Sequence, residues 1–295
     1  MTGRGRGSSG DGASLRLVLI GRPVARSRSP ELFHGLDRHG GPHVSYELLD
    51  AGPDELPRAL EDLRRGRWDG ANVTVPHKIA AARLVEDLDG AARSSGAINV
   101  VSRSDGGGLT GANTDGAGFL AALDEAFPRF EPGRAVVCGT GGAARAVAAA
   151  LAPRGWPVTF VSRATGRPRL SGLREAGPGG RIVEWGRPEL GEALSLARLV
   201  VQATPLGSSS REGESVPLPW GRLPATAVAV DLVYEPWETP FLREARRRGI
   251  RALNGWPMLV RQAAASLSIW ADPDSGAAVV ERGREIETRD PLQSA

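Results

Sequence analysis

Residues 135–144 read Ala-Val-Val-Cys-Gly-Thr-Gly-Gly-Ala-Ala, and this stretch decides the fold of the second half of the chain. An apolar run that ends in glycines and continues into an alanine-rich stretch predicts a strand, a tight turn and a helix. Another apolar run at residues 158–161 predicts the next strand. A strand, a helix and a strand in this order are typical of a parallel sheet with helices on its faces.

The glycines of the turn follow the pattern Gly-x-Gly-x-x-Ala between the predicted strand and helix. This pattern indicates dinucleotide binding, because glycines let the backbone approach a pyrophosphate and the helix N-terminus offers it N–H donors. The alternative is a glycine turn with a purely structural role. We favour the dinucleotide and predict that it is bound by these loop residues: Gly139, Thr140, Gly141, Gly142 and Ala143.

The end of the next strand indicates which dinucleotide is bound. Sites for NAD, and many sites for S-adenosylmethionine, place an acidic residue there to bind the ribose hydroxyls. Residues 162–167 read Ser-Arg-Ala-Thr-Gly-Arg and contain no acidic residue. Each arginine alone could be a solvated loop charge, but a guanidinium can bind phosphate with two hydrogen bonds. The pair therefore favours the 2′-phosphate of NADP, bound by Ser162, Arg163 and Arg167.

Length and composition describe an ordinary globular protein. The 295 residues are enough for two domains, and the hydrophobic content of 41% with 24% charged residues suits a packed core. The formal charge of +3 is modest and the arginines are spread along the chain, so we expect no nucleic-acid partner. The single cysteine, Cys138, excludes an internal disulfide and favours the cytoplasm. No apolar run approaches the roughly 18 residues that span a bilayer, and residues 1–13 are expected to be a disordered leader.

The first half of the chain predicts a second α/β unit, with a mainly parallel sheet and a ligand crevice at the carboxyl ends of its strands. A serine, Ser29, stands before Pro30 as a helix cap, and Ser27 beside it makes a pair of hydroxyls suited to a carboxylate. The expected elements are strands at 15–20, 44–49 and 69–73, helices at 29–39, 53–65, from 76, and 84–93, and a hairpin of 98–102 and 109–112.

The remaining elements complete the second unit. We expect strands at 181–185, 199–203 and 228–233, helices at 118–127, 239–248 and 258–270, a surface loop at 208–219 and a partly helical tail.

One residue at the predicted crevice is compositionally unusual. The count of Lys plus Arg is 37, and the only lysine is Lys78, so the chain has 36 arginines. An ammonium can release a proton where a guanidinium cannot, which suits acid/base chemistry. The alternative is a surface lysine that survived by chance. Lys78 follows the strand at 69–73 within the stretch Asn-Val-Thr-Val-Pro-His-Lys, so it is expected at the crevice, and His77 is expected only to fix the turn.

The ordered set of motifs resembles the shikimate dehydrogenase family. The matching stretches extend from about residue 15 to about residue 270 in the family's order, and their combination is far more specific than any one of them. They are residues 21–30 with Ser-x-Ser-Pro, 72–78, 96–99, 113–116, 139–146, 203–207, 234–236 and 255–262.

The resemblance implies an activity and an architecture. The family interconverts 3-dehydroshikimate and shikimate with NADP in aromatic amino acid biosynthesis. For this chain we expect a small-molecule substrate and a monomer or homodimer. Residues 14–114 would form a substrate domain completed by residues 255–295. Residues 115–254 would form a Rossmann-like NADP domain. No metal site is expected.

The resemblance also implies roles for individual residues. Lys78 and Asp115 match the catalytic pair, which agrees with the chemistry, since an ammonium stabilises the charge that hydride transfer builds on a ketone oxygen. Taken alone, Asp115 could equally be a helix cap. The other matched positions are Ser27, Ser29 and Tyr234 around the substrate carboxylate, Thr74, Asn99 and Gln262 at the ring hydroxyls or bracing neighbours, and Thr204, Gly255 and Met258 near the nicotinamide.

Several residues depart from the family's pattern. Val100 replaces a common threonine after Asn99, Gln202 replaces an asparagine, and Asn254 stands where aspartate is common; Ser208 and Phe33-His34 also differ. These changes keep open the alternative of a quinate/shikimate or aminoshikimate dehydrogenase. A second alternative is a non-catalytic sensor, because the fold also resembles the ligand-binding regions of quinate-responsive regulators. Both serines and Thr74 favour shikimate, and the presence of both Lys78 and Asp115 favours an enzyme.

Overall fold

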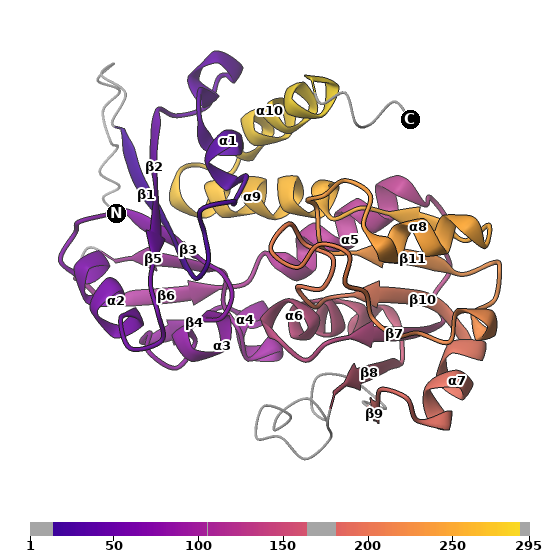
Figure 1. Ribbon diagram of the computed structural model, residues 1–295. Helices are drawn as coiled ribbons and strands as arrows, with labels where there is room; N and C mark the ends of the chain where they lie inside the picture. The colour runs from indigo at the N-terminus through magenta and orange to yellow at the C-terminus, as the bar shows by residue number, and fades with distance from the viewer. Residues whose placement is uncertain (1–13, 105, 164–180, 290–295) are drawn as a thin grey trace, which may run out of the picture.

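The computed structural model describes residues 14–104, 106–163 and 181–289, so the predicted leader and Arg167 lie outside the described residues. The chain forms two six-stranded sheets with helices around them, which confirms the predicted α/β class (Figure 1). The helices are α1 (Ser29–Phe33), α2 (Leu56–Arg64), α3 (Lys78–Ala81), α4 (Gly90–Ser95), α5 (Asp115–Ala126), α6 (Gly142–Leu151), α7 (Pro188–Ser195), α8 (Pro240–Arg247), α9 (Trp256–Trp270) and α10 (Gly276–Arg289), with short 3₁₀ turns at η1 (Leu36–His39), η2 (Ala152–Arg154) and η4 (Trp220–Arg222).

The first sheet is mixed and has the order β2-β1-β3-β5-β6-β4. Strand β1 pairs in parallel with β2 and β3, while β5 pairs antiparallel with β3 and β6, which confirms the predicted hairpin. Because the parallel strands β1 and β3 end at one edge, they deliver the loops at residues 22–28 and 74–77 to the same place. The strands are β1 (Leu15–Gly21), β2 (Val44–Asp50), β3 (Gly70–Val73), β4 (Asp87–Leu88), β5 (Val100–Arg103) and β6 (Leu109–Ala112).

The second sheet is parallel throughout, in the order β12-β11-β10-β7-β8-β9. Neighbouring residues of β7 pack into hydrophobic cores on opposite faces of the sheet: Val137 packs with α5 and α6, and Val136 packs with α7 and α8. Helices therefore cover both faces, as a parallel sheet requires. The strands are β7 (Arg134–Cys138), β8 (Val158–Ser162), β9 (Arg181–Glu184), β10 (Ala197–Gln202), β11 (Val228–Asp231) and β12 (Arg251–Leu253).

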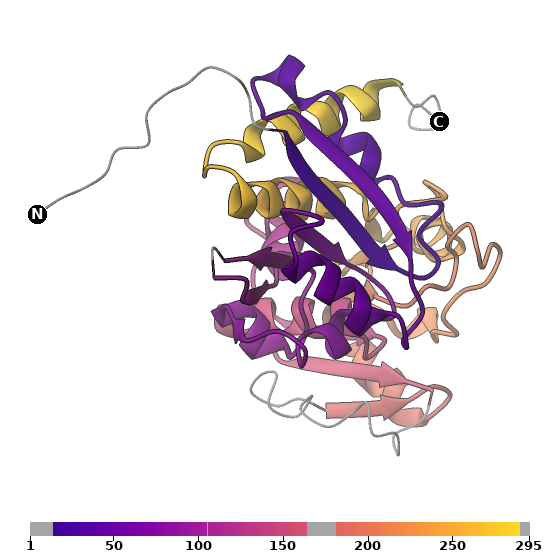
Figure 2. The same ribbon diagram turned by 90° about the vertical axis from the view of Figure 1, so that its left-hand side faces the viewer.

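The C-terminal helices α9 and α10 pack on the first sheet, although the second sheet precedes them in the chain (Figures 1 and 2). Leu17 of β1 lies in one core with Trp256 and Leu267 of α9 and Val279 of α10, whereas its neighbour Val18 packs on the α2 side. Helix α9 also lies along α5, so it borders both halves of the molecule. The exact domain limits at residues 114 and 254 stay a prediction.

Two predicted helices are wrong in extent. The helix expected over 29–39 is divided into α1 and η1, because Gly35 between them has a left-handed φ of 72°. Ser29 is the first residue of α1 and not its cap; its N–H donates instead to Oγ of Ser27, at 3.3 Å.

The helix expected over 84–93 is also wrong. Residues 87–88 form the short strand β4, which pairs with β6. Helix α4 begins only after Asp89, whose Oδ1 accepts a hydrogen bond from the N–H of Ala92 at 2.6 Å. A long-range strand pair thus replaces the first turn of a local helical pattern. The helix expected from Pro76 begins at Lys78, and α7 and β12 were not predicted.

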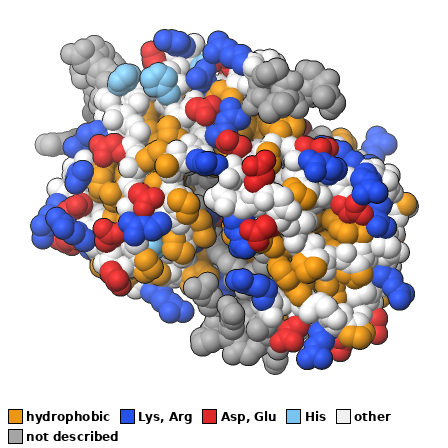
Figure 3. Space-filling model, in the orientation of Figure 1, with side chains coloured by type: hydrophobic (Ala, Val, Ile, Leu, Met, Phe, Trp, Pro, Cys, Tyr) orange, Lys and Arg blue, Asp and Glu red, His pale blue; other side chains and the backbone are white. Residues whose placement is uncertain are grey.

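None of the helices in the described ranges is long and apolar enough to cross a membrane. On the face shown in Figure 3, positive and negative side chains are interspersed.

A buried carboxyl group at the end of β11 predicts a pH dependence of stability. Asp231 is fully buried and accepts hydrogen bonds from Oγ1 of Thr239 at 2.6 Å and from the N–H of Val233 at 3.0 Å. Burial raises the pKa of Asp231 to about 7, against the attraction of these donors. An unfolded aspartate has a pKa of about 3.9, so the folded state binds the proton more tightly. The stabilisation is complete below about pH 4 and is lost as the pH rises through about 7.

We therefore expect the melting temperature of the native protein to fall, relative to that of Asp231→Asn, as the pH rises from 5 to 8.5. Thermal unfolding followed by circular dichroism at several pH values measures this difference. A difference that does not change with pH would show that Asp231 does not titrate in this range.

Candidate active site

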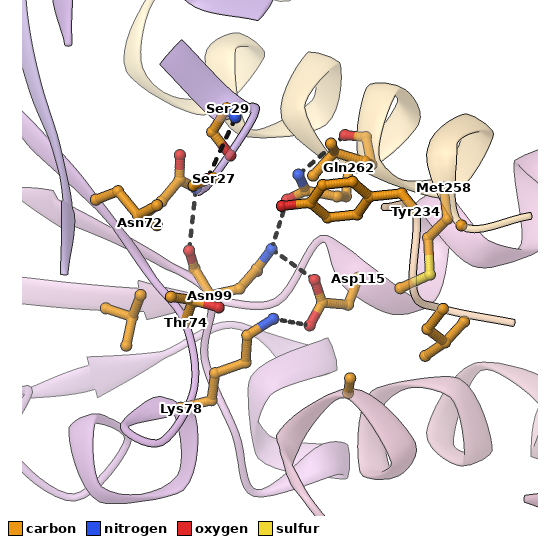
Figure 4. A pocket seen from close by; sticks show the side chains of 16 residues that line it. Ser27, Ser29, Asn72, Thr74, Lys78, Asn99, Asp115, Tyr234, Met258 and Gln262 are labelled. Atoms are coloured by element: carbon orange, nitrogen blue, oxygen red, sulfur yellow. Dashed lines mark hydrogen bonds and ion pairs between the residues drawn. The ribbon is translucent and has the colours of Figure 1, made fainter. Parts of the chain in front are cut away.

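A cavity of about 210 Å³ opens between the two sheets, at the carboxyl ends of β1 and β3. Residues of the first sheet, of α3, α5, α6 and α9 and of the loop after β11 line it, so it lies where the two halves of the chain meet (Figure 4). Every residue predicted to contact the substrate lies on its wall: Ser27, Ser29, Thr74, Lys78, Asn99, Asp115, Tyr234 and Gln262.

The centre of the cavity holds an ion pair between Lys78 and Asp115. Lys78 begins α3, directly after the loop that follows β3, and Asp115 begins α5. The Lys78 Nζ atom lies 2.5 Å from Oδ2 of Asp115, and the two side chains are only 16% and 4% exposed. A buried pair of this kind has little competition from water, so each charge depends on the other. The structure thus brings together two groups that lie 37 residues apart in the sequence.

Asn99 holds the second oxygen of this carboxylate. The Asn99 Oδ1 atom accepts a hydrogen bond from the N–H of Thr114 at 2.7 Å, which sets the orientation of its amide. The amide nitrogen then donates to Oδ1 of Asp115 and to Oε1 of Gln262, both at 3.0 Å. Because Gln262 belongs to α9, this network joins the first sheet, α5 and α9 around one carboxylate (Figure 4).

The other end of the cavity carries hydroxyl groups. Figure 4 shows Ser27 and Ser29 across the cavity from the Lys78–Asp115 pair, with Tyr234 between them and Met258. Burial raises the pKa of Tyr234, partly opposed by hydrogen bonds from the backbone of Arg28 and the side chain of Ser27. The phenol is therefore neutral at physiological pH and can donate a hydrogen bond. Three hydroxyl donors at one end of the cavity suit an anionic group of a ligand.

His77 lies outside the cavity wall. Its side chain is buried, and Nε2 lies 2.7 Å from the carbonyl oxygen of Ala51. This contact fixes the turn before Lys78, in agreement with the interpretation from the sequence.

The glycine loop between β7 and α6 fits the pyrophosphate of a dinucleotide. Gly139 has a φ of 116°, and a Cβ there would lie 3.0 Å from the carbonyl oxygen of Ala203. A Cβ on Gly141 would meet no atom within 4 Å, so the loop faces open space. Among the described residues, no side chain caps α6, which leaves its first N–H groups available to an anion.

Only some of the other residues predicted to bind the cofactor, together with Ala143 of the loop, line the cavity. Ala143, Gly255 and Met258 line the cavity. Thr204 does not, and its hydroxyl donates to Oε1 of Gln202 at 2.7 Å. Ser162 ends β8 with the exposed Arg163 after it, whereas Arg167 lies outside the described residues.

Comparison with known proteins decides the family. Residues 19–101 match the model of the shikimate dehydrogenase substrate binding domain. The NADP(+)-dependent shikimate dehydrogenase of Symbiobacterium thermophilum is 40% identical over 271 residues, which cover 90% of this chain and 92% of the relative. The chain belongs to the shikimate dehydrogenase family.

Solved structures of shikimate dehydrogenases share the whole fold. The enzyme of Thermus thermophilus, in complex with NADP(H) and shikimate, is 38% identical, with a TM-score of 0.76 and coverage of 91% of this chain and 99% of that one. The shikimate dehydrogenase of Aquifex aeolicus is 30% identical, with a TM-score of 0.80 and coverage of 95% and 99%. The arrangement of a substrate-binding half and a Rossmann-like half is therefore that of the shikimate dehydrogenases.

The residues that depart from the shikimate dehydrogenase pattern do not line the cavity. Val100 is fully buried and does not line the cavity. Gln202 donates to the carbonyl oxygens of Thr204 and Leu206, at 3.0 and 2.8 Å, and so shapes its own turn. Asn254 accepts from the N–H of Trp256 at 2.7 Å, at the start of α9. None of the three removes a group from the cavity.

One polar residue of the cavity was missed by the sequence analysis. Asn72 lines the wall; its Oδ1 accepts from the hydroxyl of Tyr46 at 2.7 Å, and its amide donates to the carbonyl oxygen of Asn99 at 3.1 Å. Its rarity was the available signal, since the chain has only four asparagines. Its position inside a buried strand concealed that its side chain reaches the cavity.

Proposed function

We propose that this chain is an NADP-dependent shikimate dehydrogenase, which reversibly reduces 3-dehydroshikimate to shikimate in aromatic amino acid biosynthesis. The observation that carries the proposal is the buried Lys78–Asp115 pair in a cavity that faces the glycine loop. Relatives with this activity at 40% identity over most of the chain support it.

The chain's own residues supply the proton chemistry. Bound NADPH provides the hydride that adds to the carbonyl carbon of the substrate. As the carbonyl oxygen gains negative charge, the ammonium of Lys78 stabilises it and then donates a proton to complete the alcohol. Asp115 holds the ammonium in place, and Asn99 holds Asp115. In the oxidative direction Lys78 takes the proton back.

The hydroxyl end of the cavity orients the substrate. Ser27, Ser29 and Tyr234 would bind its carboxylate, and this places the ring across the cavity from that end, towards Lys78. Thr74, Asn99 and Gln262 would contact the ring hydroxyls. Fixing a small ring at both ends lowers the entropic cost of reaching a reactive geometry.

The preference for NADP predicts the effect of one substitution. We expect Arg163→Ala to raise the KM for NADP at least roughly tenfold, because it removes a charge-assisted hydrogen bond to the 2′-phosphate. The KM for NAD, which lacks this phosphate, is expected to change less than about twofold. Steady-state kinetics with both cofactors measures the two effects, with Arg154→Ala, a distant exposed arginine, as control. An equal rise in both KM values would contradict the assignment.

The alternatives differ in what the pair of charged groups would do. A quinate/shikimate or aminoshikimate dehydrogenase would use the same pair on another ring, whereas a sensor would bind its ligand without turnover. Oxidation of shikimate by the purified protein, followed by the absorbance of NADPH, separates enzyme from sensor. Absence of turnover with every ring tested, despite binding, would favour the sensor. A cytoplasmic location and a monomeric or homodimeric state belong to the same proposal.

A further inference from the structure

Gly142, in the loop predicted to bind the cofactor, also contacts the side chain of Lys78. A Cβ built on Gly142 would lie 2.6 Å from Cβ of Lys78, 3.1 Å from its Cδ and 3.3 Å from its Cγ. The aliphatic stem of Lys78 therefore lies directly against the bare Cα of Gly142. Its nearest atom is the rigidly held Cβ and not the mobile end of the side chain, so the stem could not move aside without a shift of α3.

Backbone conformation does not explain why residue 142 is a glycine. Gly142 is the first residue of α6 and is not among the glycines with a positive φ. An alanine is therefore compatible with its backbone, and helix propensity would favour one. What excludes a side chain at this position is the contact with Lys78.

Helix α6 also holds the partner of the lysine. A Cβ on Gly116, the residue after Asp115, would lie 2.8 Å from the carbonyl oxygen of Ala146 and from Cβ of Ala150. Helix α5 thus starts in close contact with α6. Both members of the ion pair are therefore held near one helix: Lys78 contacts its first residue, and the neighbour of Asp115, Gly116, contacts Ala146 and Ala150 further along.

We propose that Gly142 is a positioning residue for Lys78, which couples the cofactor loop to the geometry of the proton donor. The proposal rests on the proposed function, in which Lys78 donates the proton. Gly142 confines the stem of the lysine while Asp115 binds its ammonium, so the distance of 2.5 Å between Nζ and Oδ2 depends on a residue of the cofactor loop.

The adjacent glycine provides a matched control. A Cβ on Gly141 would meet nothing within 4 Å, and its φ of −75° is accessible to any residue. Its Cα faces the open side of the loop, where the pyrophosphate is expected. Of these two neighbouring loop glycines, only Gly142 contacts the lysine.

The first test separates the two roles by steady-state kinetics. We expect Gly142→Ala to lower kcat for shikimate oxidation, measured at saturating NADP, at least roughly 30-fold, in addition to any rise in the KM for NADP. Gly141→Ala should raise this KM at least roughly tenfold but keep kcat at saturating NADP within about threefold of the native value. If both variants changed only the KM for NADP, Gly142 would be an ordinary member of the phosphate loop and the proposal would be overturned.

The second test needs no activity, because Lys78 is the only lysine. The protein without cofactor is treated with an amine-reactive reagent, and the peptide that contains Lys78 is quantified by mass spectrometry after cleavage at arginine. We expect Gly142→Ala to change the labelling rate at least roughly threefold, and Gly141→Ala to leave it within about twofold. Equal rates in all three proteins would overturn the proposal. The labelling result stands even if shikimate is not the substrate, so failure of the proposed function is distinguishable.

A stability cycle covers the case in which Gly142→Ala folds poorly. If the added methyl group clashes with Lys78, then Lys78→Gly should relieve it. The loss of melting temperature caused by Gly142→Ala is expected to be at least halved in the Lys78→Gly background, since contacting residues are energetically coupled. An equal loss of melting temperature in both backgrounds would show that the methyl group clashes with another residue, and it would overturn the proposal that Gly142 positions Lys78.

Discussion

Lys78→Arg is expected to lower kcat at least roughly 100-fold, equivalent to about 2.7 kcal/mol of transition-state stabilisation, while the protein keeps its fold. Arginine retains the positive charge but does not release a proton near neutral pH. The site also has little room for it, because the stem of Lys78 lies against Gly142 and its head against Asp115. Measurement of kcat at saturating substrate and cofactor, with circular dichroism for the fold, tests this expectation.

The control for this substitution is the reverse exchange at a nearby exposed position. Arg83→Lys, five residues further on, keeps a charge at the surface and is expected to leave kcat within about twofold. Near-normal turnover of Lys78→Arg would show that positive charge alone is sufficient and that Lys78 is not the proton donor.

Asp115→Asn is expected to have an effect of similar size. Its two oxygens accept from Nζ of Lys78 at 2.5 Å and from the amide of Asn99 at 3.0 Å. Asparagine has about the same volume as aspartate but no charge. Its amide N–H group would also face either Nζ of Lys78 or the amide of Asn99, which are themselves donors. Breaking a buried ion pair costs roughly 3–5 kcal/mol of folding stability. Because the ammonium also loses the group that holds it in place, we expect kcat to fall roughly 100-fold, equivalent to about 2.7 kcal/mol of transition-state stabilisation.

The same helix provides the matched control. Asp124 of α5 forms an ion pair with Arg154 at 2.8 Å, but its side chain is 54% exposed. An exposed pair contributes little, so Asp124→Asn should change neither kcat nor the melting temperature appreciably. If Asp115→Asn kept kcat within about threefold of the native value, the carboxylate would be dispensable and the catalytic pair would be wrong.

The parts of the fold that were predicted well are those with a local cause. Alternation of strand, glycine turn and helix around Gly139 predicts β7, α6 and β8, and each of them is present. The errors have long-range causes. Nothing local shows that Asp87 and Leu88 pair with β6, or that Gly35 interrupts a helical pattern by adopting a left-handed φ.

The site residues likewise divide into those that local motifs predict and contacts that depend on long-range packing. The order of the motifs predicts the family and the residues that line the cavity, and family membership is confirmed. Spacing could not show that Lys78 and Asp115 meet, because that distance depends on how α3, α5 and α6 pack. Likewise, the sequence predicts Gly142 only as a glycine of the phosphate-binding loop. Its contact with Lys78 in the structure shows that this contact also excludes a side chain at position 142.

The most direct test of the function is a panel of kcat/KM values for shikimate, quinate and aminoshikimate, each with NADP and with NAD. We expect the highest value for shikimate with NADP, because both serines, Thr74 and the pair of Lys78 with Asp115 line the cavity and Arg163 follows β8. The highest value for quinate with NAD would contradict both the substrate and the cofactor.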